Sequence, residues 1–118
     1  MNESILRSVA KYLGIGSDDT FFDPELVLII NANLAILHQL GVITSTTFAI
    51  EDSSTTWAEL LIDDDRLEEA KMYVAIRTRL AFDPPTNSFL VNTLTETFKE
   101  YEQRMLMTLD DREAGVDQ

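Results

Sequence analysis

The chain has no cysteine, one histidine and no long apolar run. Without cysteine it can form neither disulfides nor thiolate metal sites, which fits a reducing compartment. It has neither ~18 consecutive apolar residues nor a signal-peptide pattern, so we expect no membrane span and no export. It also lacks a Gly-rich phosphate loop, an HExxH motif and a GxSxG motif. These absences predict that the protein is not an enzyme and needs no cofactor.

Basic residues are scarce: nine stand against 21 acidic residues, for a net charge of −12. This balance argues against a surface that grips nucleic acid, because phosphate neutralisation requires clustered lysine and arginine. It is compatible with a wall along which DNA slides without binding. It is equally compatible with simple solubility through like-charge repulsion.

The length of 118 residues and the apolar content of 45% indicate one folded domain. A chain of this size buries roughly 65% of its unfolded surface, enough for one modest core. We assign residues 1–109 to this domain. Residues 110–118 are charged and lack an apolar stripe, so we expect a flexible acidic tail that a partner could order.

The apolar periodicity predicts an all-α fold, a small antiparallel bundle of two short and three longer helices. The first short helix covers residues 4–13 and ends at Gly14. The second helix starts at Asp23, the expected N-cap before Pro24, and ends at Gly41. It is apolar over more than half of its circumference. We therefore expect it at the centre of the bundle or, over part of its surface, against a neighbouring subunit.

The helix within residues 67–85 has the clearest boundaries. Asp65 and Glu68 are expected to form an N-cap and capping box, and a double proline ends the helix. Arg77 lies near the middle of its apolar arc. Two roles are open for this arginine: an intramolecular pair with a carboxylate, or an anchor in a subunit interface.

The segment at about 42–55 is rich in Thr, Val, Ile and Phe and has no helical stripe. This composition suits extended structure or a long loop, in which Phe48 and Ile50 would face the same way. A link of this length in a compact domain is often functional. It either packs on its own domain or forms an arm or a channel-facing loop.

Residues 56–62 are predicted to form a short helix, because Thr56 and Glu59 match a capping box. The only tryptophan, Trp57, is expected either as a lid over the core or in a subunit contact. The acidic run 63–65 lacks the spacing of an EF-hand, so we interpret it as a charged turn and predict no metal site.

The last helix is expected to run from about residue 88 to about Leu109. Apolar residues recur along it at spacings of three and four: Leu90, Leu94, Phe98, Tyr101, Met105 and Leu109. Phe89 and Met107 fall on its otherwise polar side and are therefore contact candidates.

Two polar residues of the second helix need separate interpretation. Asn33 falls within the apolar arc, and a buried amide without partners costs ~1–3 kcal/mol. It is expected either to bond a local backbone group or to fix helix register, within or between subunits. His38 lies on the polar strip and is expected at the surface. The subunit-interface candidates are Asn33, Phe48, Ile50, Trp57, Arg77 and Phe89.

The helix that ends in Phe-Asp-Pro-Pro also carries a resemblance to a known family. The residues that carry it are Tyr73, Val74, Arg77, Leu80, Phe82, Asp83, Pro84 and Pro85. Upstream matches are Asp23-Pro24, Ile30-Asn31, Gln39-Leu40-Gly41-Val42 and Thr56-Trp57. In this order, over residues 23–104, the chain resembles the head–tail connector proteins of tailed phages, also called adaptor or head-completion proteins.

The resemblance implies a structural ring, usually twelve-fold, beneath the portal of a filled phage head. Such a ring extends the DNA channel and provides the docking surface for stopper or tail-completion proteins. The implied location is the virion neck, after assembly in the host cytoplasm. The implied partners are further copies of the chain, the portal and a stopper or tail protein, with DNA passing unbound. The C-terminal segment of connectors commonly reaches the portal, which gives four portal-binding candidates: Met105, Met107, Leu109 and Arg112.

Two competing functions fit the residues without the resemblance. One is a helical protein–protein interaction module. The other is an acidic DNA mimic that inhibits a nucleic-acid-binding enzyme.

Overall fold

A computed structural model describes the backbone of residues 3–116 and the side chains of residues 3–108. Its elements are α1 (Ile5–Tyr12), α2 (Asp23–Gln39), the short 3-10 helix η1 (Trp57–Leu60), α3 (Asp64–Phe82) and α4 (Ser88–Val116). The described backbone contains no strand, and its only β-type pairing is an isolated antiparallel bridge between Ser4 and Thr56. The predicted all-α class is confirmed. There are four α-helices rather than five helices, because the segment at 56–62 forms only a 3-10 turn.

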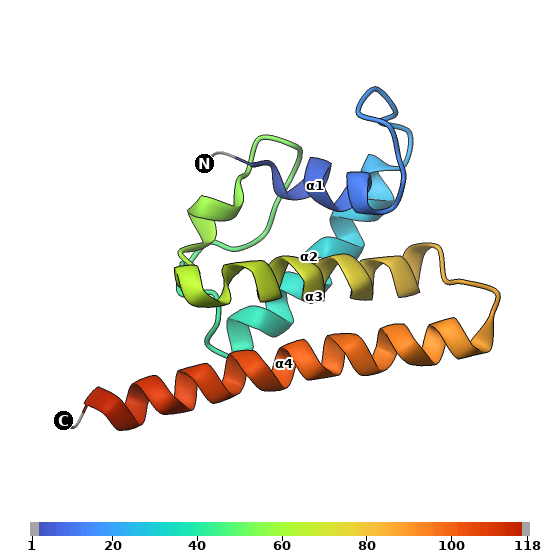
Figure 1. Ribbon diagram of the computed structural model, residues 1–118. Coiled ribbons are helices and arrows are strands. Elements are labelled where there is room, and N and C mark those ends of the chain that lie inside the picture. The colour runs from blue at the N-terminus through green and yellow to red at the C-terminus, as the bar shows by residue number, and fades with distance from the viewer. Residues whose placement is uncertain (1–2, 117–118) are drawn as a thin grey trace.

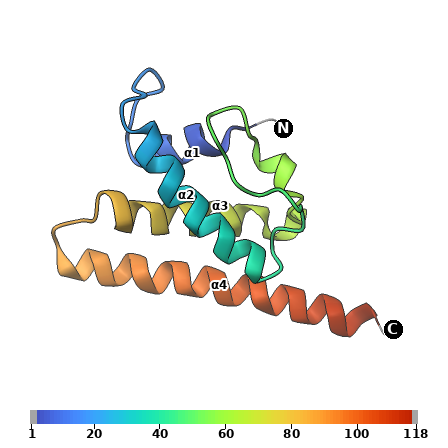
Figure 2. The same cartoon turned by 180° about the vertical axis from the view of Figure 1, so that it is seen from behind.

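Helix α3 is the central element of the arrangement. Helices α3 and α4 form an antiparallel hairpin, while α2 crosses α3 obliquely and α1 lies beyond them, away from α4 (Figures 1 and 2). The bundle is therefore antiparallel only in its α3–α4 half. Helix α4 is the longest element, and its C-terminal end extends past the other helices (Figure 1).

Two glycines end the first two helices as predicted. Gly14 and Gly41 have φ of +83° and +84°, a left-handed conformation that glycine adopts without strain. In each case the next residue donates a backbone hydrogen bond back across the last helical turn: Ile15 to the Ala10 carbonyl (2.9 Å) and Val42 to the Leu37 carbonyl (3.0 Å). This pattern is the Schellman motif, which satisfies carbonyls that the helix end leaves open.

Two predicted N-caps are wrong by one or two residues. Phe22 occupies the N-cap of α2, and the carboxylate of Asp23 pairs with Arg7 instead of capping the helix. Helix α3 begins at Asp64, so Asp65 lies in its first turn. Carboxylates in a first turn are favoured by the positive end of the helix dipole, so both placements remain electrostatically favourable.

The core lies between α1, α2, α3, the irregular segment before α3 and the inner face of α4. Trp57 is 2% exposed and fills the space against α1, so it is the core lid that the sequence allowed. The buried apolar residues include Ile5, Val9, Leu26, Ile30, Leu34, Leu37, Ile50, Leu60, Tyr73 and Val74. Burial of large side chains such as these contributes ~1.5–3 kcal/mol each. Because a helix as short as α1 is marginal on its own, its stability comes from this packing against the core.

The segment at 42–55 packs on its own domain. The side chain of Asn31 binds the Ile50 backbone twice, donating from Nδ2 to the carbonyl (2.9 Å) and accepting from the amide at Oδ1 (2.7 Å). His38 stacks on Phe48 with ring centroids 4.4 Å apart. These contacts attach the segment to α2, as in the first of its two predicted interpretations.

The last helix is longer than predicted, since α4 continues to Val116 instead of ending near Leu109. The residues predicted as a flexible tail, 110–118, thus include helical backbone up to Val116. Their side chains lie outside the described residues, and their mobility stays a prediction.

Candidate assembly interface

The hairpin helices and α2 are joined by a polar contact inside the apolar core. Asn33 on α2 accepts a hydrogen bond from Arg77 Nε (2.9 Å) at Oδ1 and donates from Nδ2 to Thr78 Oγ1 (3.2 Å). Asn33 and Thr78 are buried. The amide therefore fixes the register of α2 against α3 within one chain, and a local backbone partner, the first of the two predicted options, is wrong. Arg77 has an intramolecular partner, but it is an amide rather than a carboxylate.

Arg77 and Tyr73 extend this contact to α4. The Arg77 guanidinium lies 4.8 Å from the centroid of the Phe98 ring and 5.5 Å from that of Tyr73. The Tyr73 hydroxyl donates a 2.9 Å hydrogen bond to Glu102 Oε1. Burial of the ring and this bond to a carboxylate raise the pKa of Tyr73 to about 12. We call Asn33, Tyr73, Arg77, Thr78 and Glu102 the α3 hub, because it connects α3 to both neighbouring helices.

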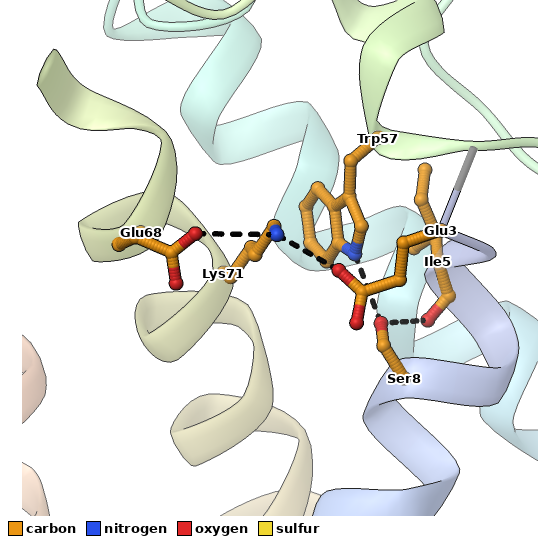
Figure 3. Close-up of polar contacts among 6 residues, drawn as sticks. All are labelled: Glu3, Ile5, Ser8, Trp57, Glu68 and Lys71. Carbon is orange, nitrogen blue, oxygen red and sulfur yellow. Dashed lines mark hydrogen bonds and ion pairs between the residues drawn. The ribbon is translucent and has the colours of Figure 1, made fainter. Parts of the chain in front are cut away.

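A second polar joint attaches the N-terminal segment to η1 and α3 (Figure 3). Lys71 on α3 donates hydrogen bonds to Glu3 (2.8 Å) and Glu68 (3.3 Å), while Trp57 Nε1 donates to Ser8 Oγ (2.9 Å). The hydrogen bond that Lys71 donates to Glu3 is the main cause of the raised pKa of Lys71. Because these residues come from three distant parts of the sequence, the joint holds one end of the domain together.

Arg66 is a buried charge that the sequence analysis missed. It is 1% exposed; its Nη2 donates to Asp63 Oδ2 (2.7 Å), and its buried Nε and Nη1 have no hydrogen-bond partner among the described residues. The signal was present in the spacing: Arg66, Ala70 and Tyr73 follow an i, i+4, i+7 pattern on one face of α3. Because Arg66 lies among charged residues, it was not counted as part of the buried face.

The predicted interface residues fall into two groups. Asn33, Ile50 and Trp57 are covered by their own chain, so their side chains offer no surface to a second subunit in this fold. Phe48 and Arg77 are half-buried, and Phe89 is 77% exposed at the start of α4. The interface candidates that remain are therefore Phe48, Arg77 and Phe89.

The predicted portal-binding residues also differ from one another. Met105 is fully buried in the core, because it faces α3. Met107 is 63% exposed, two residues along the same helix. Leu109 and Arg112 have side chains outside the described residues. Only Met107 is thus a described, accessible candidate on the part of α4 near the projecting end.

Large apolar side chains are exposed at several separate places rather than in one patch. They are Phe21, Leu28, Leu61, Phe89, Leu90 and Met107. Leu61 is also the one non-glycine residue with positive φ in the described backbone, at +56°.

Neither a metal centre nor a membrane span is found in the described part of the chain. No group of three or more His, Cys, Asp or Glu side chains there is arranged to hold a metal ion. None of the helices, as far as their residues are described, has the length and apolar character to cross a bilayer.

Comparison with known proteins identifies the family. The model of a phage connector protein family matches residues 5–112. No curated protein and no solved structure matches the chain. Because the match extends over nearly the whole chain, the chain belongs to the phage connector family, and the resemblance carried by the helix ending in Phe-Asp-Pro-Pro is confirmed.

Proposed function

We propose that this member of the phage connector family forms a ring beneath the portal of a tailed-phage head. The ring extends the DNA channel and gives a stopper or tail protein its docking surface, so the chain works in the virion neck. The role is structural and uses no cofactor. The observation that carries the proposal is the family match over residues 5–112.

The division of the chain into a fixed part and accessible parts supports an assembly role. The α3 hub and the joint around Trp57 hold the helices in one arrangement without help from a partner. Phe89 and Met107 lie outside both, near opposite ends of the described part of α4. A ring subunit needs two different surfaces for its neighbours, and further surface for the proteins above and below it.

The charge of the chain supports a channel role. With a net charge of −12, a ring of many copies carries a strongly negative surface. Negative walls repel DNA phosphates and let the duplex pass without adhering. The twelve-fold symmetry that we propose for the ring comes from the resemblance to connector proteins, whose rings usually match a twelve-fold portal.

The projecting end of α4 is the proposed portal contact. Its backbone is helical to Val116, and its C-terminal end extends past the other helices (Figure 1). Met107 supplies an exposed apolar side chain near that end. Removing residues 110–118 should abolish portal attachment and leave the fold intact, because the α3 hub and Met105 precede the cut. Wild-type attachment by the truncated chain would refute this contact.

The function is tested in phage particles. A phage that lacks this chain should accumulate DNA-filled heads without tails, and supply of the chain in trans should restore tailed particles. Electron microscopy gives the numbers of tailless heads and of tailed particles. Normal numbers of tailed particles without the chain would rule out the connector role.

A further inference from the structure

The C-terminal end of α1 borders an apolar groove with a basic rim. Its volume is about 410 Å³, and it is lined by Arg7, Ala10, Lys11, Ile15, Gly16 and Ser17. We call it the α1 groove. Ala10 and Ile15 supply apolar surface, while Arg7 and Lys11 supply the only charges along its lining.

The cations of the α1 groove have unused hydrogen-bonding capacity. Arg7 uses Nη2 to bind Asp23, but its buried Nε and Nη1 have no partner among the described residues. Lys11 is exposed and forms no ion pair within the described part of the chain. Ala10 and Ile15 suit the groove to an apolar side chain, and the exposed ammonium of Lys11 suits it to a carboxylate beside that side chain.

The start of α4 presents an exposed aromatic side chain and carboxylates on one face of the helix. Phe89 is held in place there, because its backbone amide donates to Asn87 Oδ1 (2.8 Å), yet its ring is 77% exposed. Glu96 and Glu100 lie on the same outer face of the helix as Phe89. At ~1.5 Å per residue, Glu96 is ~10 Å along the helix from Phe89.

We propose that the α1 groove of one copy receives Phe89 of a second copy, with Glu96 of that copy directed toward Lys11. The proposal rests on the ring function and specifies its subunit contact. Within one chain Phe89 does not fill the α1 groove, because its ring is 77% exposed and it is not part of the groove lining. Helix α3 lies between α1 and α4 (Figures 1 and 2). Each copy then has one groove and one Phe89 to offer. Such a heterologous contact closes into a ring when the rotation per subunit fits.

Cross-linking tests the contact directly, because the native chain has no cysteine. A Ser17→Cys variant is mixed with an Asn92→Cys variant, assembled on portal rings and treated with a short bifunctional maleimide. Asn92 lies on the Phe89 face of α4, so this pair should give at least about tenfold more covalent dimer than a matched control. The control replaces Asn92→Cys by Gln103→Cys, on the same helical face but ~16 Å further along.

Two further variants test the groove itself. Gly16→Trp should fill it without disturbing the fold, because no heavy atom lies within 4 Å of where a Cβ would be. Lys11→Glu should oppose Glu96 by like-charge repulsion, and a Glu96→Lys partner should restore assembly. We expect each single change to weaken assembly about tenfold or more, with circular dichroism unchanged.

The outcomes separate this proposal from the ring function. Rings that form with equal cross-linking at Asn92→Cys and Gln103→Cys, or that tolerate Gly16→Trp, overturn the α1 groove contact and leave the ring function standing. If the wild-type chain forms no ring even with portal present, the ring function fails, and this contact fails with it.

Discussion

The α3 hub and the first turns of α4 are neighbours in the fold but are built in opposite ways. In the hub, Asn33 and Thr78 are buried and bonded to each other, and Tyr73 is buried with its hydroxyl bonded to Glu102. At the start of α4, Phe89 and Leu90 expose much of their side chains to solvent. The hub holds α2, α3 and α4 together within one chain, whereas the α4 start leaves apolar surface in contact with solvent.

The two regions are expected to contribute to different free energies, the hub to folding and the α4 start to association. Interactions within the hub stabilise the folded monomer, so changes there should lower its stability. Residues at the α4 start contribute little to monomer stability, so changes there should affect association alone. Two substitutions in the hub and one at the α4 start test this separation, and Trp57→Ala, in the core outside the hub, sets the upper end of the stability scale.

The largest effect on stability is expected from Trp57→Ala. The side chain is almost completely buried and donates a hydrogen bond to Ser8 Oγ, so its removal leaves a cavity and removes that bond. We expect a loss of ~3–5 kcal/mol in the free energy of unfolding, measured by urea denaturation. Leu28→Ala, on an exposed site of α2, is the control and should lose less than ~0.5 kcal/mol. Equal losses of unfolding free energy in the two variants would contradict the assignment of Trp57 to the core and Leu28 to the surface.

Asn33→Ala should give the next largest loss, ~1–3 kcal/mol, because Arg77 Nε and Thr78 Oγ1 lose their partner inside the core. Urea denaturation again provides the measurement. Asn92→Ala, on the exposed face of α4, is the matched control. An Asn33→Ala variant as stable as its control would mean that the hub does not hold α2 against α3.

Tyr73→Phe should lower stability by ~0.5–1.5 kcal/mol at neutral pH, through loss of the hydrogen bond to Glu102. It should also change the alkaline pH profile. The folded-state pKa of Tyr73 is raised from 10.0 to about 12, so its stabilisation is complete below pH 10 and is lost as pH rises through about 12. The variant should lack this decline between pH 10 and 12.

Tyr12→Phe serves as the control for the alkaline profile, since it removes a tyrosine hydroxyl outside the hub. Urea denaturation at each pH separates the contributions. A Tyr73→Phe variant that retains the wild-type decline would assign the decline to other groups, of which Lys71, with its own raised pKa, is the first candidate.

The smallest effect on stability and a large effect on assembly are expected from Phe89→Asp. The side chain is exposed, so unfolding should change by less than ~0.5 kcal/mol. Ring formation, followed by light scattering with portal particles, should be lost because the apolar anchor is replaced by a charge. A variant that unfolds much more easily, or that assembles normally, would remove the distinction between the two regions.

Much of the fold was predictable from local patterns. The glycine stops after the first two helices, the capping box at Thr56 and the double proline after α3 act within a few residues, and each is found where predicted. The N-caps of α2 and α3 were not, since they fall on Phe22 and Asp63 instead of Asp23 and Asp65. For Asp23, tertiary pairing with Arg7 competes with capping.

The candidate interface was less predictable, because it depends on which apolar surface the chain covers by itself. Trp57 and Phe89 are both aromatic residues near helix starts, yet one is in the core and the other is in solvent. Periodicity alone gave no reason to separate them. The partner of Asn33 lies 45 residues away, and no local pattern indicates a contact at that separation.

The most direct test of the ring function is the mass and symmetry of the purified protein, alone and mixed with portal particles. Light scattering gives the mass, and negative-stain imaging gives the symmetry. We expect a closed ring that forms either alone or on the portal, in register with the portal. A chain that stays monomeric and does not bind the portal would contradict the ring function, and only the description of the helical domain would stand.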